Sequence, residues 1–321
     1  MIQRMTCFLG SLLLVLLIHS SALAAETEPQ MSEAHTEASA ESWDRLGVDE
    51  PSTRARTELA IFQLYHGLFY GMQSCSVFDC DNPQVYSSLV TSGGALGLGG
   101  SVLLTRGGIT SGQARAINSG SLWGAGTGAV AAGLIAEQPG RTVLRTMLVT
   151  QAAGTGAGYL LSNHLRPTGG DVRLVNSVGL WAGIYYLLIT EGVLQMDQTA
   201  PLLGIGLLAS TTAGAIVGSQ LAIESPMSAS RVAIISASGL VGGYFGSALP
   251  IFFSGQAGSL RDARLEAILA LAGITAGLGI GANLTQEWDS DEPAYQRTAM
   301  SFSLLPTNDG DGLQGAIMGR F

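Results

Sequence analysis

Apolar residues between positions 54 and 286 gather in segments that carry no charge for 17 residues or more, and charged residues fall in the gaps between them. Within these segments glycines stand four residues apart, Ala and Leu are frequent, and apolar residues do not alternate with polar ones. This pattern favours helices over strands. It predicts eight helices, at about 55–73, 87–105, 113–136, 142–163, 172–193, 201–222, 231–253 and 262–285.

The sequence repeats itself about every sixty residues. QARAINSGSLWGAG at 113–126 matches DVRLVNSVGLWAGI at 171–184, and RVAIISASGLVGGY at 231–244 is a weaker copy. A second glycine-rich element precedes each copy, so we expect a two-helix unit, with 55–73 and 262–285 as half units at the two ends. The predicted fold class is mainly α: a bundle of about eight glycine-rich helices built from this repeat of about 60 residues.

Glycine inside a helix costs about 0.5–1 kcal/mol relative to alanine, so something must offset that cost. Glycines four residues apart form a groove in which a second helix backbone can lie close. A phosphate-binding loop would need a preceding strand, and none is predicted. The glycines expected at helix contacts are Gly67, Gly71, Gly100, Gly120, Gly124, Gly158, Gly179, Gly183, Gly218, Gly239, Gly243 and Gly281.

The first two copies of the repeat share two polar positions, occupied by Arg115 and Asn118 in one copy and by Arg173 and Asn176 in the other. We expect these four residues to cap helix ends by bonding loop carbonyls. The alternative is a ring of arginines that gathers an anion.

Candidate chemistry is scarce. The sequence holds no G-x-S-x-G elbow, no lysine for a phosphate loop, and no second His or Cys at ligand spacing from any histidine. We expect His66, on an apolar helix, to be buried or at an interface and bonded to a neighbouring backbone. The sequence therefore predicts a protein that is not an enzyme, with no cofactor and no metal site.

The first 24 residues have the pattern of a secretory signal peptide. Arg4 precedes the apolar run 7–18, and Ala22-Leu23-Ala24 forms a small-x-small cleavage site. Residues 25–53 are acidic and poor in apolar side chains, so we expect a disordered leader. The bundle is predicted to occupy 54–286.

The net charge excludes one class of partner, and the cysteine pair suits an exported protein. The net charge of −9 argues against nucleic-acid binding, because no basic stripe is present to neutralise phosphates. Cys75 and Cys80, five residues apart, form either a local disulfide or a pair of free thiols.

Eight uncharged runs with glycines four apart indicate a membrane bundle, although a soluble bundle with a glycine core would have a similar sequence. The inner membrane fits poorly, because the gaps expected outside hold more arginine than those expected in the cytoplasm. The outside gaps hold Arg54, Arg56, Arg106, Arg115, Arg166, Arg173 and Arg231; the cytoplasmic gaps hold Arg141, Arg145, Arg261 and Arg264. The outer envelope, either outer membrane or periplasm, is the expected location.

Residues 287–321 are expected to form a linker and a β-hairpin. Apolar residues alternate with serines over 300–304, TNDGDG at 307–312 predicts the turn, and the chain ends at Phe321. This ending resembles that of bacterial outer-membrane proteins. We expect one apolar face of the hairpin to cover the last helix, at 262–285, as a cap on a half unit. That face comprises Phe302, Leu304, Ile317 and Phe321.

The mature chain resembles a loosely defined set of exported bacterial proteins with GQAR-x-I-x-x-G-x-x-WG units and a GRF ending, matched here at 112–124 and 319–321. The resemblance implies a similar repeat architecture but assigns no functional site.

Together the patterns predict a non-enzymatic cell-envelope protein, membrane-embedded or membrane-associated. Its expected partners are membrane lipid or an envelope protein, with self-association as a further expectation and no nucleic acid. The alternatives are a soluble periplasmic binding module and a small-solute pore or carrier. A pore needs a polar stripe, for which the candidates are Asn118, Asn176, Gln151 and Gln220.

Overall fold

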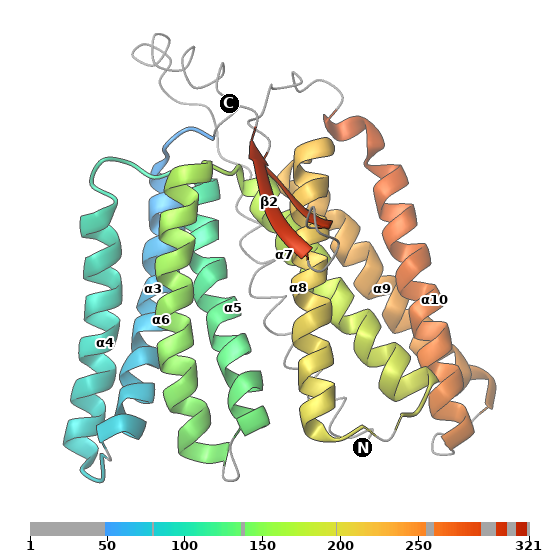
Figure 1. The fold of residues 1–321 in the computed structure, drawn as a ribbon, viewed down its shortest axis with the longest axis horizontal. Coiled ribbons are helices and arrows are strands. Elements are labelled where there is room, and N and C mark those ends of the chain that lie inside the picture. Colours follow the sequence, from blue (N-terminus) through green and yellow to red (C-terminus); the bar gives the residue numbers. More distant parts are fainter. Residues whose placement is uncertain are drawn as a thin grey trace. The chain divides into compact units, whose positions relative to one another are not determined.

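The computed structural model describes residues 49–319 except 79, 136–138, 197, 255–259, 290–299 and 307–312. This part of the chain is mainly helical, with eight long α-helices that match the eight predicted segments to within a few residues (Figure 1). They are α3 (Thr53–Phe78), α4 (Pro83–Leu104), α5 (Ser111–Ile135), α6 (Pro139–Leu165), α7 (Gly169–Leu187), α8 (Ala200–Glu224), α9 (Ala229–Ser254) and α10 (Leu260–Leu284). A π-turn (Leu188–Val193) extends α7, and a 3-10 turn (Gln286–Asp289) follows α10.

The helices pack as four consecutive hairpins: α3 on α4, α5 on α6, α7 on α8 and α9 on α10. Neighbouring units meet through their first helices, with α3 against α5, α5 against α7 and α7 against α9, and α3 also contacts α6 as α5 contacts α8. The predicted frame of the repeat is therefore wrong. The helix at 55–73 begins a complete unit, and the helix at 262–285 completes one, so neither is a half unit.

The first helix of each unit begins with the same cap. The hydroxyls of Ser52, Thr110, Thr168 and Ser228, which recur every 58 to 60 residues, each accept the backbone N–H three positions later, at 3.1 to 3.3 Å. In α7 the side chain of Asp171 also accepts the backbone N–H of Thr168, which completes a capping box. These side chains satisfy N–H groups that a helix leaves unpaired at its start.

Within each unit, glycines bring the two helix backbones together. A Cβ added at Gly120 would lie closer than 3.0 Å to the carbonyl oxygen of Gly154 on α6, and one added at Gly154 would meet Gly120 in the same way. Gly67 faces the backbone of α4 at Gly93, and Gly218 faces that of α7 at Val175. Side chains larger than hydrogen are thus excluded where these helices cross. Backbone also crowds the Cβ positions of Gly71, Gly124 and Gly158, whereas a Cβ at Gly281 would first meet the side chain of Ser238.

Other predicted glycines lie differently. Gly100 is not at a contact, since an added Cβ would meet no described atom within 4 Å; the prediction for Gly100 is wrong because this part of α4 faces open space. A Cβ added at Gly179 would lie 3.2 Å from the carbonyl oxygen of Thr211, so this position is less crowded, while one added at Gly183 would meet the side chains of Thr211 and Leu207. On α9 the backbone contacts come from Gly242 and Gly246, whereas Gly239 and Gly243 face side chains, chiefly those of Leu278, Trp181 and Ile274.

The described part of the chain ends in two strands. Strand β1 (Met300–Pro306) pairs antiparallel with β2 (Leu313–Gly319), and the register sets Phe302 opposite Ile317. The turn and Phe321 lie outside the described residues, so the hairpin's apolar face stays a prediction. The hairpin was expected to cap α10 because α10 was taken as a half unit. That reason no longer holds, because α10 pairs with α9.

At the other end, residues 1–48, which hold the predicted signal and most of the leader, lie outside the described part. The leader was expected to extend to residue 53, but Ser52 caps α3 and Asp49 bonds to two helices, so these residues belong to the bundle.

The contact geometry predicts opposite effects for two alanine substitutions in α5. Gly124→Ala places a Cβ 2.9 Å from Cα of Gln151 on α6, so the helices must separate and stability should fall by about 1–3 kcal/mol. Gly126→Ala faces open space and should raise helix stability by about 0.5–1 kcal/mol. Thermal unfolding of the purified protein in detergent, followed by circular dichroism, measures both. Equal stabilities of the two variants would contradict close backbone contact at Gly124.

Candidate functional site

The predicted polar residues of the repeat divide into two groups. Arg173 donates from Nη1 to the carbonyl of Ala229, the first residue of α9, at 2.8 Å. Arg115 forms an ion pair with Glu58 on α3, with 3.5 Å between Nε and Oε1. Both arginines therefore lie near the ends of helices and connect neighbouring units.

Asn118 and Asn176 do not cap helix ends, so that prediction is wrong for them. Both lie more than one turn inside their helices, where they bond side chains of the preceding unit. Asn118 Oδ1 accepts from Gln63 Nε2 on α3 at 3.0 Å, and Asn176 Oδ1 accepts from Trp123 Nε1 on α5 at 2.8 Å. The asparagines thus link the first helices of successive units.

A row of polar side chains follows one face of α3 between α5 and α6. Gln63, His66, Tyr70 and Gln73 stand three or four residues apart, so they share one side of the helix. Their neighbours on α5 and α6 are also polar. We call the whole set the polar row: Gln63, His66, Tyr70 and Gln73 on α3, Asn118 and Ser121 on α5, and Gln151 and Thr155 on α6.

Hydrogen bonds connect most of the polar row. The hydroxyl of Ser121 lies against Nδ1 of His66 and accepts from Gln151 Nε2 at 3.2 Å. The hydroxyl of Tyr70 lies 2.9 Å from that of Thr155. His66 was expected to bond a neighbouring backbone; its Nδ1 lies against the side-chain hydroxyl of Ser121.

Several buried amide atoms of the polar row lack a partner among the described residues. Gln73 is 0% exposed, and neither its Nε2 nor its Oε1 makes a hydrogen bond there. Gln151, 1% exposed, leaves Oε1 unpaired, and Asn118 leaves Nδ2 unpaired. A buried polar atom without a partner costs about 1–3 kcal/mol, so each such atom calls for a water or a ligand.

Charged residues lie beyond both ends of the polar row, and the buried apolar residues Leu59, Ala114 and Ile117 lie between its Gln63 end and the start of α3. At the end where α3 begins lies the ion pair of Glu58 and Arg115. At the other end Arg145 on α6 donates from Nε to the carbonyl of Ser76 at 2.8 Å. Cys75 and Cys80 form a disulfide at this second end, joining the last turn of α3 to the segment before α4.

Sequence reasoning identified Asn118 and Gln151 as candidates for a polar stripe but missed the residues of α3. The spacing of Gln63, His66, Tyr70 and Gln73 was the available signal, because a polar residue at every third or fourth position marks one helix face. The other two stripe candidates lie elsewhere: Asn176 is between α5 and α7, and Gln220 is on α8.

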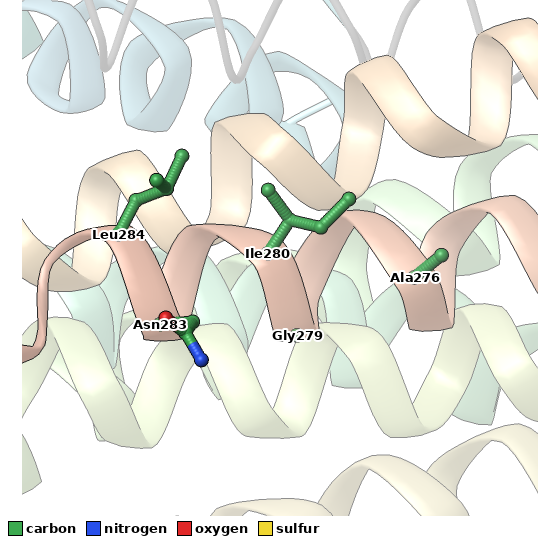
Figure 2. Close-up of a pocket in the computed structure, with 5 residues that line it drawn as sticks. All are labelled: Ala276, Gly279, Ile280, Asn283 and Leu284. Carbon is green, nitrogen blue, oxygen red and sulfur yellow. The ribbon is translucent and has the colours of Figure 1, made fainter.

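A shallow, open hollow lies on the outer face of α10, lined by that helix alone. Ile280 and Leu284 project from the same side of the helix (Figure 2), and the one polar side chain of the lining is Asn283. The hollow holds no charged or nucleophilic group. Within the described residues, no three His, Cys, Asp or Glu side chains lie together as a metal site would require.

Comparison with known protein families, with curated proteins and with solved structures gave no match.

Asp49 provides a test of how the helix starts are held together. Its Oδ2 accepts from Ser111 Oγ at 2.5 Å, from Gly112 N at 3.0 Å and from Gly169 N at 2.7 Å, so one carboxylate serves the N-termini of α5 and α7. Asp49→Ala should lower stability by about 1–2 kcal/mol. The neighbouring Glu50 is exposed, and Glu50→Ala should change stability by less than about 0.5 kcal/mol. Thermal unfolding of the two variants measures both changes. Similar losses of stability in both would show that the three hydrogen bonds to Asp49 do not stabilise the fold.

Proposed function

We propose that the protein is a non-enzymatic component of the cell envelope whose helical bundle is embedded in a membrane. The observation that carries the proposal is the exposure of large apolar side chains along helices of membrane-spanning length. Five helical segments are long and apolar enough to cross a bilayer: Pro83–Leu104, Gly169–Val193, Pro201–Glu224, Ala229–Leu249 and Ala263–Leu284.

The apolar side chains of these segments point mostly away from the protein. Only 11% of the most apolar window is buried in α4 and in α8, and at most 28% in the other three. Leu96 is 75% exposed, Tyr244 70% and Leu284 74%. In water such surface would favour aggregation, whereas lipid chains would cover it.

The three remaining helices, α3, α5 and α6, are the ones that carry the polar row. Their polar side chains lower their hydropathy and face one another inside the bundle. This arrangement, polar inside and apolar outside, is expected of a bundle in lipid.

The envelope location rests on the predicted signal peptide, on the disulfide and on the arginine distribution, which opposes an inner-membrane orientation. Membrane lipid or an envelope protein is the proposed partner, and self-association through exposed helix faces is compatible with the same surface. A soluble periplasmic binding module is the alternative; it would have to cover the exposed faces with protein. A small-solute pore or carrier is the second alternative, and the polar row is the observation that favours it.

Cell fractionation tests the proposal. The full-length chain should sediment with membranes, resist extraction by alkaline carbonate and float with lipid in a density gradient. Release by carbonate together with a monodisperse, detergent-free protein would contradict membrane embedding.

Two leucines of α4 provide a matched test of depth. Leu96 and Leu104 are 75% and 70% exposed, but Leu96 lies in the middle of the segment and Leu104 is its last residue. In a bilayer, Leu96→Arg should cost about 2.5–3.5 kcal/mol, whereas an arginine at 104 can reach the interface. Membrane-inserted yield and thermal stability in lipid should therefore fall for Leu96→Arg alone. Near-neutral effects of both substitutions would indicate that α4 faces water.

A further inference from the structure

We propose that lipid chains cover the outer face of α9, so that no second copy of the chain stacks on it. The inference rests on the proposed membrane embedding and names the partner of one face of the bundle. α9 is the first helix of the last unit, and in the described part of the chain it packs chiefly on α10 and α7. Its outer face is exposed, with Val241 55% and Phe245 61% accessible to solvent.

The residues that join one unit to the next stand at fixed distances from the recurring helix caps. The ninth residue after the cap of α5 is Ser119, which donates to Asn176 on α7. Its counterpart in α7 is Ser177, whose hydroxyl lies 2.6 Å from that of Ser236 on α9. The same position of each helix thus makes a hydrogen bond to the unit that follows.

Three more positions of these helices bond the following unit. The fifth residue after the cap is arginine in both, and Arg173 donates to a backbone carbonyl of α9. The thirteenth is tryptophan in both, and Trp123 Nε1 donates to Asn176 at 2.8 Å. The seventeenth residue in α7 is Tyr185, with its hydroxyl 2.6 Å from that of Thr275 on α10. Because the four positions are four residues apart, they share one side of the helix, which we call the forward face.

In α9 all four positions of the forward face are apolar. Counted from the cap residue Ser228, they are occupied by Ala233, Ala237, Val241 and Phe245. Relative to α7, alanine replaces arginine, alanine replaces serine, valine replaces tryptophan and phenylalanine replaces tyrosine. The opposite side of α9 keeps its polar contact, since Ser236 still bonds Ser177. Hydrogen-bonding groups are therefore missing only from the side of α9 that no described unit covers.

This replacement suits a hydrocarbon environment. Lipid chains offer no hydrogen-bond partner, so a polar side chain that faces them is costly, whereas alanine, valine and phenylalanine are not. In soluble repeat proteins the terminal unit instead carries a polar outer face. A second copy stacked on α9 would find none of the donors that the inner contacts use.

The one polar tip beside the forward face lies near the end of the helix. Tyr244 is 70% exposed and stands five residues before the end of the apolar segment Ala229–Leu249. Tyrosine is common at this level of a membrane, where its ring lies in the apolar layer and its hydroxyl reaches the headgroups. Tyr244 therefore fits the same lipid-covered face.

Tryptophan fluorescence tests the proposal with the purified full-length chain in phosphatidylcholine liposomes, with and without bromine on the acyl chains. Bromine quenches a tryptophan that it contacts. Val241→Trp adds a tryptophan on the forward face of α9, and brominated lipid should quench most of the added emission. Phe245→Trp repeats the test one turn away, in case the first variant does not fold.

The matched control is Tyr185→Trp, which adds a tryptophan at the seventeenth position of α7, the counterpart of Phe245. There α10 lies against the forward face, as the contact with Thr275 shows. Brominated lipid should quench several-fold less of the emission added by Tyr185→Trp than of that added by Phe245→Trp.

Photo-cross-linking tests for protein neighbours in cells that express the full-length chain. p-Benzoylphenylalanine incorporated at position 241 reacts on irradiation with whatever lies beside it. The expected product keeps the mass of a single chain, because lipid is the neighbour. An adduct with a second copy or with another protein would overturn the proposal.

The outcomes of the liposome experiment keep the two proposals apart. A chain that floats with the liposomes but shields a tryptophan at 241 and at 245 from brominated lipid would overturn the lipid-covered face and leave membrane embedding intact. Equal quenching in Tyr185→Trp and Phe245→Trp would also overturn it, because the two forward faces would then not differ. A chain that does not float would overturn both proposals.

Discussion

The close approach of two helix backbones within each unit is the constraint on which the rest of the structure depends. At pairs such as Gly120 with Gly154 and Gly242 with Gly273, a Cβ on either residue would collide with a carbonyl oxygen of the other helix. A contact surface made of glycine has no room for Leu, Ile or Phe, so these residues are displaced to the outer faces. The exposed apolar surface of α4 and α8 is therefore a consequence of how the hairpins pack.

Contacts between units follow a different rule. The first helices of neighbouring units are joined by side-chain hydrogen bonds: Gln63 with Asn118, Trp123 with Asn176, and Ser177 with Ser236. Such bonds fix the register of one unit on the next. The helices they join are far enough apart for side chains to lie between them. In the described part of the chain, the polar contacts between the first two units cover about three turns of α3, from Gln63 to Gln73, and unpaired amides remain there. The polar row is thus a longer version of the contact between first helices, which the later units make with a few side-chain hydrogen bonds.

The sequence predicted the eight helices well, because uncharged runs and glycines four residues apart occur in every one of them. It did not predict the frame of the repeat, since both helices of a unit carry the same glycine spacing and periodicity alone cannot pair them. The recurring caps at Ser52, Thr110, Thr168 and Ser228 would have shown where each unit starts. The prediction that Gly100 lies at a helix contact was wrong. Aligning the repeats gives its position in the unit, whereas contact depends on which face of α4 meets α3. The α3 members of the polar row were missed because each polar residue was assessed singly, and the partners of Asn118 and His66 lie 55 residues away.

The placement of polar and apolar groups bears on how such a bundle could be stable. In water, burial of large apolar side chains supplies most of the favourable free energy, yet the most buried side chains include Gln73, Gln151 and Ser121. In lipid, helices associate through close van der Waals contact and interhelical hydrogen bonds, and glycine interfaces with polar links provide both. The same polar residues that weaken a water-soluble core would therefore hold the units together in a membrane. The proposed lipid environment would therefore suit the glycine contacts, the buried hydrogen bonds and the apolar exterior together.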